Sequence, residues 1–189
     1  MKCYWIISLL LISFLSCTNR IYLHRIKGYF NSDNIKSRGR WLSEDCHSYF
    51  IEKKGDGEDK VSALNSFLNW DAPLHPDLRI LNYTVKGNIC TIEFNEQNDF
   101  SKLIQYPGWK GTEIIRFNSK KLIDQVIYIP ANDNPDYKTW LKPAVDWLQN
   151  KYPDEIIEIY KGGKLIKNPV TARKWVLLLQ RWRKVTGSK

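Results

Sequence analysis

Polar side chains with useful chemistry gather at the end of one alternating segment, CTIEFNEQNDF (90–100). In an extended strand alternate side chains share a face, so Glu96 and Asn98 continue the apolar face that includes Phe94. A carboxyl group at the end of an apolar interior loses part of its hydration, which raises its pKa and suits it to proton transfer. The amide of Asn98 could orient a ligand carbonyl. The pattern therefore makes both residues candidates for ligand binding, and Glu96 a candidate catalytic acid or base.

The same residues also have structural explanations. Asn98 or Asp99 directly precedes the short helical segment FSKLIQY and would cap its free N–H groups. Glu96 would pair with Arg116 or with a lysine. The sequence leaves both interpretations open.

A second acid and several rings are further candidates. Asp124 alternates with Val126 and Tyr128, which predicts an inward-facing acid on another strand. Tyr83, Tyr106 and Trp109 could line a pocket and stack on a flat ligand, although aromatic residues at strand spacing are also typical of a core. Tyr128 is a further candidate for ligand binding.

Cofactor and metal chemistry find no support in the sequence. It has no GxSxG, P-loop, dinucleotide-binding glycine pattern or HExxH motif. His24, His47 and His75 lie far apart without ligand spacing, and there is no CxxC. We therefore expect no cofactor and no metal. Cys46 and Cys90 are expected to be buried thiols, with a disulfide between them as the alternative.

The N-terminus predicts export. Residues 4–15 form an uncharged apolar run, which is too short for a helix of roughly 20 residues that spans a bilayer but fits a signal peptide. Ser16 and Cys17 follow, and this junction resembles the cleavage site of bacterial lipoproteins, except that Phe14 stands where Leu is usual. The resemblance implies a signal peptide over 1–16 and a lipid on Cys17, which anchors the chain to a membrane of the bacterial cell envelope. An ordinary secretory signal and an uncleaved anchor are the alternatives.

The basic charge is concentrated at the C-terminus. The formal net charge is +9, and the residues from Lys161 onward hold nine Lys or Arg and no acid. A basic helix there could touch an anionic surface or could simply be a solvated helix face. Nucleic acid is not expected as a partner, because an exported protein rarely meets it.

Periodicity predicts helices, then strands, then helices again. Over 36–54, the residues Leu42, Cys46, Tyr49 and Phe50 share one helical face, and a second helix is expected over 61–70. GDGED (55–59) is expected to be a turn rather than a calcium loop. Two hairpins follow, over 79–98 and 109–130, with the short helical segment between them. Helices are expected over 137–149, at 153–160 and from Asn168 on. The last helix is expected to pack its Trp side onto the domain, with a membrane surface as the alternative.

This order of elements, with the run W-x-G-x-x-x-x-R-F-N-x-x-x-L-I at 109–123, resembles the NTF2-like superfamily, which includes SnoaL-like and ketosteroid-isomerase-like proteins. The resemblance implies an α+β cone over 36–130, in which helices pack on a curved antiparallel sheet. A tether with a short helix (17–35) would precede the cone, and a helical basic extension (131–189) would follow it. Members of this superfamily include enzymes, binding modules and structural proteins. For this chain we expect a non-catalytic module that binds a small apolar ligand, a glycan or a partner protein of the envelope. The alternative is a cofactor-free isomerase, dehydratase or hydrolase that uses Glu96, or Asp124 with Tyr128 or Tyr83.

Overall fold

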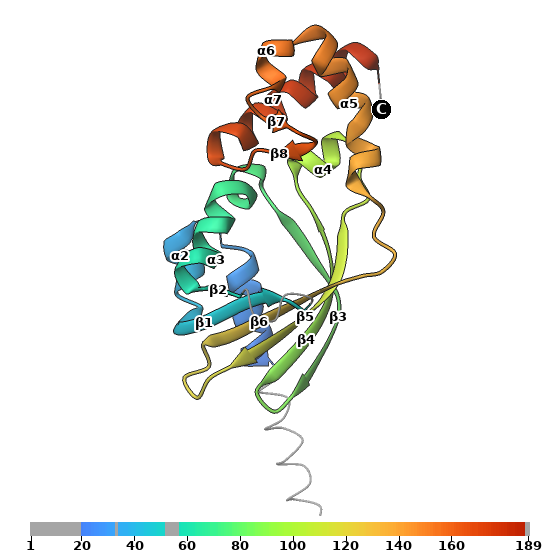
Figure 1. Ribbon diagram of the computed structural model, residues 1–189. Helices are drawn as coiled ribbons and strands as arrows, with labels where there is room; N and C mark the ends of the chain where they lie inside the picture. Colours follow the sequence, from blue (N-terminus) through green and yellow to red (C-terminus); the bar gives the residue numbers. More distant parts are fainter. Residues whose placement is uncertain (1–19, 33, 52–56, 188–189) are drawn as a thin grey trace, which may run out of the picture.

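The structure is a computed structural model that describes residues 20–32, 34–51 and 57–187. It has a cone of helices and strands at one end and a helical part at the other (Figure 1). The expected signal peptide, Cys17 and the first two residues of the GDGED turn lie outside the described residues.

A curved sheet forms the wall of the cone. Its six strands are β1 (Leu42–Phe50), β2 (Glu58–Asp59), β3 (Asp77–Lys86), β4 (Ile89–Gln97), β5 (Trp109–Phe117) and β6 (Ile123–Pro130). Their order is β2-β1-β6-β5-β4-β3, and all neighbours are antiparallel except β1 and β6. Both predicted hairpins are confirmed, and Gly87 turns the first of them with φ +63°.

The helix predicted over 36–54 is wrong. A short helix, α2 (Ile35–Gly39), is followed directly by strand β1. Leu42 and Cys46 are both 3% exposed, and residues four apart share a face in a strand as well as in a helix. Their spacing therefore could not separate the two structures. The segment forms a strand because it pairs with β6 on one side and with β2 on the other.

Helices cover the concave side of the sheet. Residues 20–30 are helical, and α3 (Lys60–Ser66), the π-helical turn η2 (Phe67–Asp71) and η3 (Ala72–Leu74) confirm the helix expected over 61–70. Asp59 caps α3 by accepting a hydrogen bond from the Ser62 amide. The cone core joins these helices to the sheet, and its buried members include Tyr22, Ile26, Leu64, Ile92, Phe94, Ile115 and Phe117.

The helical part has a core of its own. It contains α4 (Asp99–Leu103), α5 (Tyr137–Lys151), α6 (Pro153–Ile156) and α7 (Pro169–Thr186). Trp175, Leu179 and Trp182 of α7 are buried in this second core, as the amphipathic pattern predicted. A small hairpin, β7 (Tyr160–Lys161) and β8 (Lys164–Leu165), stands where the sequence predicted only the end of a helix.

Cys46 and Cys90 are buried free thiols, as expected. Burial raises the pKa of Cys46 to about 12 and the pKa of Cys90 to about 11, so both stay protonated at neutral pH. Among the residues described, none of the helices combines the length and apolar character that crossing a bilayer requires.

Candidate functional site

The inner faces of β4 and β5 place two carboxyl groups in the cone. The register sets Ile92 opposite Glu113, Phe94 opposite Gly111, and Glu96 opposite Trp109. Ile92, Phe94 and Gly111 are buried, so this is the core face of the sheet. The inward direction predicted for Glu96 is therefore confirmed.

Glu113 is the more deeply buried of the two carboxyl groups, and the sequence analysis missed it. Its Oε2 atom is buried and has no hydrogen-bond partner within the described part of the chain. Burial first, and the charge of Glu96 second, raise the pKa of Glu113 to about 8. A buried carboxyl oxygen without a hydrogen-bond partner is unusual in a folded protein, and it indicates a place where another group can bind.

Glu96 lies in a similar environment. Burial, followed by the charge of Asp71, raises its pKa to about 7, whereas the charge of Arg38 lowers it. The expected salt bridge with Arg116 is not formed, because the Arg116 Nε donates to Asp124 Oδ1 at 2.8 Å. Nor does any lysine of the described chain lie within salt-bridge distance of Glu96.

Asp71 and Arg38 complete the charged cluster. Asp71 ends η2, and burial raises its pKa. The guanidinium Cζ of Arg38 lies 3.9 Å from the ring centre of Phe67 and 4.1 Å from that of Tyr29. Contacts of a guanidinium with two ring faces fix its position. Arg38 is thus a held cation beside several acids.

Tyr128 brings a hydroxyl group to the same face. It lies opposite Glu113 in the β5–β6 register, and its ring centre is 5.7 Å from that of Phe94 and 4.7 Å from that of Phe50. Burial, then the charges of Glu96 and Glu113, raise the pKa of Tyr128 to about 12. Its hydroxyl therefore stays protonated and can donate a hydrogen bond over the whole physiological pH range.

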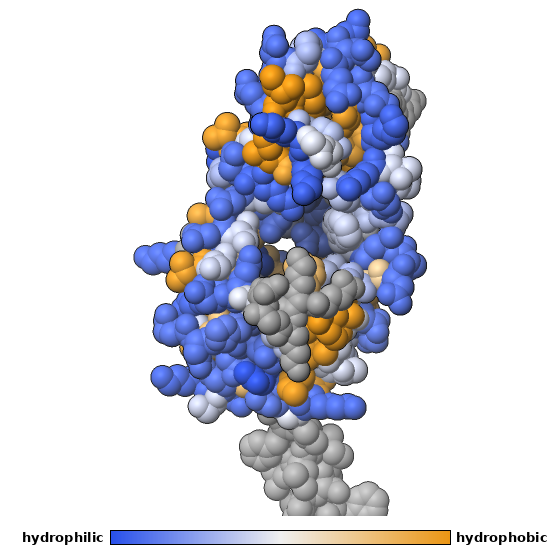
Figure 2. Space-filling view, viewed as in Figure 1, coloured by the Kyte–Doolittle hydropathy of each residue, from blue (hydrophilic) through white to orange (hydrophobic). Residues whose placement is uncertain are grey.

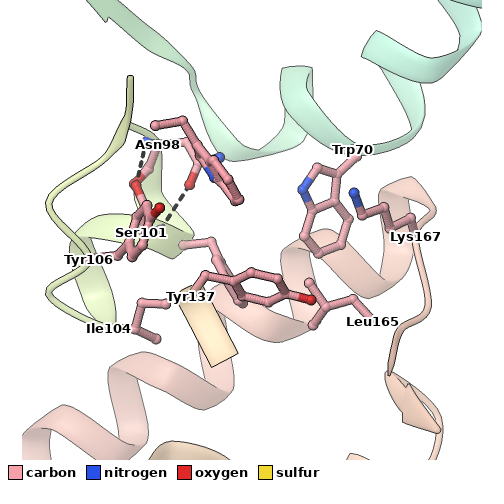
Figure 3. A pocket seen from close by; sticks show the side chains of 10 residues that line it. Trp70, Asn98, Ser101, Ile104, Tyr106, Tyr137, Leu165 and Lys167 are labelled. Atoms are coloured by element: carbon pink, nitrogen blue, oxygen red, sulfur yellow. Dashed lines mark hydrogen bonds between the residues drawn. The ribbon is translucent and has the colours of Figure 1, made fainter. Parts of the chain in front are cut away.

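Figure 3 shows a cleft with several aromatic side chains in its lining. It has a volume of about 110 Å³ and is lined by Trp70, Asn98, Phe100, Ser101, Ile104, Tyr106, Trp109, Tyr137, Leu165 and Lys167. Trp70 precedes Asp71 in the chain, and Trp109 pairs with Glu96, so the cleft and the charged cluster are neighbours. The Lys167 Nζ lies 5.3 Å from the Trp70 ring centre.

This site lies where the two cores meet. Phe94 belongs to the cone core and Tyr128 packs against it. Phe100 belongs to the second core and Trp70 packs against that core. Figure 2 shows an opening in the surface between the cone and the helical part. The charged cluster and the cleft therefore form one candidate site at the mouth of the cone.

The remaining predicted site residues fall in different places. Asn98 is the N-cap of α4, accepting from the Ser101 amide at 2.8 Å, and it also lines the cleft. Trp109 lines the cleft as predicted. Tyr83 lies opposite Ile92 but is 43% exposed and is not part of the cleft lining.

Asp124 does not join the cluster. It lies at the register shift between β5 and β6 and is paired with Arg116. The acids that act on Tyr128 are Glu96 and Glu113, so the structure does not bring Asp124 and Tyr128 together as the resemblance suggested.

The arrangement can hold a small molecule and exchange protons with it. Two carboxyl groups with pKa values near neutrality can each donate or accept a hydrogen bond, and the Tyr128 hydroxyl can donate one. Within the described ranges, no three His, Cys, Asp or Glu side chains are placed to hold a metal ion. One signal for Glu113 was present in the sequence, because it interrupts the alternating buried positions Gly111, Ile115 and Phe117.

Comparisons with known proteins identify the fold. No family model and no curated protein matches the sequence. Among solved structures, RV0760c from Mycobacterium tuberculosis is 13% identical with a TM-score of 0.50, covering 60% of this chain and 93% of its own. A protein of unknown function with a cystatin-like fold from Methylobium petroleophilum is 14% identical with a TM-score of 0.50, covering 62% and 80%. A putative ketosteroid isomerase from Kribbella flavida is 12% identical with a TM-score of 0.49, covering 61% and 82%.

The likenesses to RV0760c and to the protein with the cystatin-like fold, together with the curved sheet, confirm the α+β fold of helices on a curved antiparallel sheet that the sequence predicted. At such identities they show the fold alone. Function has to be argued from the site.

Proposed function

We propose that this protein is a non-catalytic module that binds a small molecule at the mouth of its NTF2-like cone. The observation that carries the proposal is the unpaired Oε2 of Glu113, buried opposite Tyr128 on the inner face of the sheet that also carries Glu96. A bound molecule would supply the missing hydrogen bond, and the adjoining cleft would hold its apolar part.

The test is a screen of small neutral and charged compounds against the full chain, by ligand-observed NMR and thermal shift. Leu165 lines the cleft, so Leu165→Trp should fill it without touching the carboxyl groups. Leu177→Trp is the matched control, because Leu177 is 57% exposed on α7. We expect compounds that bind the wild type and the control but not the filled variant. The proposal is wrong if no compound binds, or if compounds bind Leu165→Trp as tightly as the wild type.

A cofactor-free enzyme is the second candidate. It is favoured by the pKa of Glu96, about 7, because general acids and bases work best near the operating pH. For an isomerase, dehydratase or hydrolase, Glu96→Gln should abolish turnover of a compound found in the screen while the fold survives. For a binding module, the same change alters affinity only.

We further propose, from the sequence alone, that the module is an exported lipoprotein of the bacterial cell envelope with its acyl chains on Cys17. The partner would then be an envelope protein or an anionic surface that faces the basic helix α7. Metabolic labelling with a fatty-acid analogue tests the anchor. Label should appear on the wild type and be lost in Cys17→Ser, and equal labelling of both would refute the proposal.

A further inference from the structure

We propose that the molecule bound at the cone mouth is a monocation, an ammonium group carried on a single apolar ring. The inference rests on the proposed function and names the class of ligand. It follows from the charges, the orphan acceptor and the rings of the site.

The charges leave the cluster short of cations. Glu58, Asp71, Glu96 and Glu113 supply four carboxyl groups, whereas Arg38 acts on the last three of them and Lys167 acts on Asp71 alone. With all six groups ionised the cluster carries −2. A bound ammonium would reduce this excess, whereas an anion would add to it.

Neither of the existing cations pairs with Glu113 Oε2, which has no hydrogen-bond partner among the described residues. Arg38 is held between the rings of Tyr29 and Phe67, and Lys167 lies over Trp70 in the cleft. The orphan acceptor is on the inner side, where Glu113 lies between the buried residues Gly111 and Ile115. An ammonium has three N–H donors and no acceptor, so one N–H can donate to the unpaired Oε2 of Glu113 while the others meet a ring face or water.

The rings define the body of the ligand. Tyr128 and Phe94 border the carboxyl groups on the cone side, and Trp70, Trp109 and Tyr137 line the cleft. The cleft volume is about 110 Å³. A cavity of roughly 150 Å³ accepts benzene in another protein, so this cleft with its opening takes one ring at most.

Binding of such a cation is coupled to proton release. The titratable and charged groups that face the two carboxyl groups are Tyr29, Arg38, Glu58, Asp71, Tyr106, Tyr128 and Lys167. Because Glu96 and Glu113 are partly protonated at neutral pH, an arriving ammonium displaces protons from them. Its affinity should therefore rise with pH up to about 9 and fall once the amine itself deprotonates near pH 10.

Isothermal titration calorimetry on the full chain tests the inference. The probes are benzylamine, 2-phenylethylamine and cyclohexylmethylamine, each compared with the alcohol of the same skeleton, and 3-phenylpropanoate as the anion. At pH 8 we expect at least one amine to bind about tenfold or more tightly than its alcohol. That preference should shrink about tenfold at pH 6, and the heat should vary with the buffer because protons are released.

Single-residue variants test whether Glu113 causes the preference for the amine over its alcohol. Glu113→Gln should remove the preference for the amine, whereas Glu93→Gln should keep it, because Glu93 is exposed on the outer face of the same sheet. The inference is overturned if each alcohol equals its amine, if the anion binds best, or if no amine binds while other compounds do. In those cases the binding module survives and only its ligand class changes. If neither these probes nor the screened compounds bind, both the ligand class inferred here and the proposed binding function are wrong.

Discussion

Replacing Glu113 by Gln should remove much of the pH dependence of stability. In the unfolded chain the pKa of a glutamate is near 4.5, and in the folded protein that of Glu113 is about 8. The folded state therefore holds more protons between these values, and stability falls as pH rises from about 4.5 through about 8. The difference corresponds to at most about 5 kcal/mol. Relaxation of the protein around a buried charge lowers this cost, so we expect about 2 to 3 kcal/mol.

The assay is urea unfolding followed by Trp fluorescence at pH 5, 7 and 9. The free energy of unfolding of the wild type should fall from pH 5 to pH 9 by about 2 to 3 kcal/mol more than that of Glu113→Gln. Using the difference between two pH values cancels the constant effect of the amide. Part of the fall should remain in the variant, because burial also raises the pKa of Glu96 to about 7.

Other titratable groups do not account for the expected difference between the wild type and Glu113→Gln. They titrate outside pH 5 to 9 or contribute equally to the stability of both proteins. The pKa of Tyr128 is raised to about 12, and the pKa of Asp45 and that of Asp59 are lowered. Glu93→Gln is the control and should follow the wild type. An identical pH dependence in Glu113→Gln and the wild type would refute the assignment of Glu113 as a buried, unpaired acid.

Three further changes test the scaffold by urea unfolding. Trp175→Ala should cost about 3 to 5 kcal/mol, because Trp175 is 0% exposed, whereas Trp140→Ala, at 38% exposed, should cost less than half of that. Equal losses would contradict the assigned core. Asn98→Ala should cost about 1 kcal/mol through loss of the helix cap, and no loss would mean that the cap contributes nothing. Gly108→Ala should cost more than Gly87→Ala, because both have positive φ but only at Gly108 would the new Cβ collide with β4. The reverse order would refute that packing.

The sequence predicted both hairpins of the sheet, and β4 shows the clearest alternation between buried and outward residues. The sequence also placed Glu96 on the inner face, since a single strand register fixes that direction. It failed for β1, whose residues Leu42 and Cys46 are an even number apart and fit either period. The hairpin of β7 and β8 was missed because two-residue strands carry no periodicity.

The site was only half predictable, because its residues come from distant parts of the chain. Asn98 and Trp109 were named, yet their cleft also needs Trp70 and Lys167, which only the fold brings together. Arg38 carries no local signal at all. Its role depends on packing between rings of two other helices.

The position of the first helix has a consequence for how the protein would stand on a membrane. Tyr22, near the start of this helix, stacks on Phe117 and accepts a hydrogen bond from Lys121, so the helix begins at the β5–β6 turn, the end of the cone far from α7 (Figure 1). If Cys17 carries lipid, the three residues to position 20 reach at most about 11 Å.

The cone would then stand upright with its hairpin turns toward the anchoring leaflet. Strand β4 alone has nine residues, about 30 Å, and α7 lies beyond its far end, several times the screening length of roughly 8 Å at physiological salt. The anchoring membrane would be out of electrostatic range for the basic face of α7. That face would point outward, toward whatever anionic polymer or opposing surface shares the compartment.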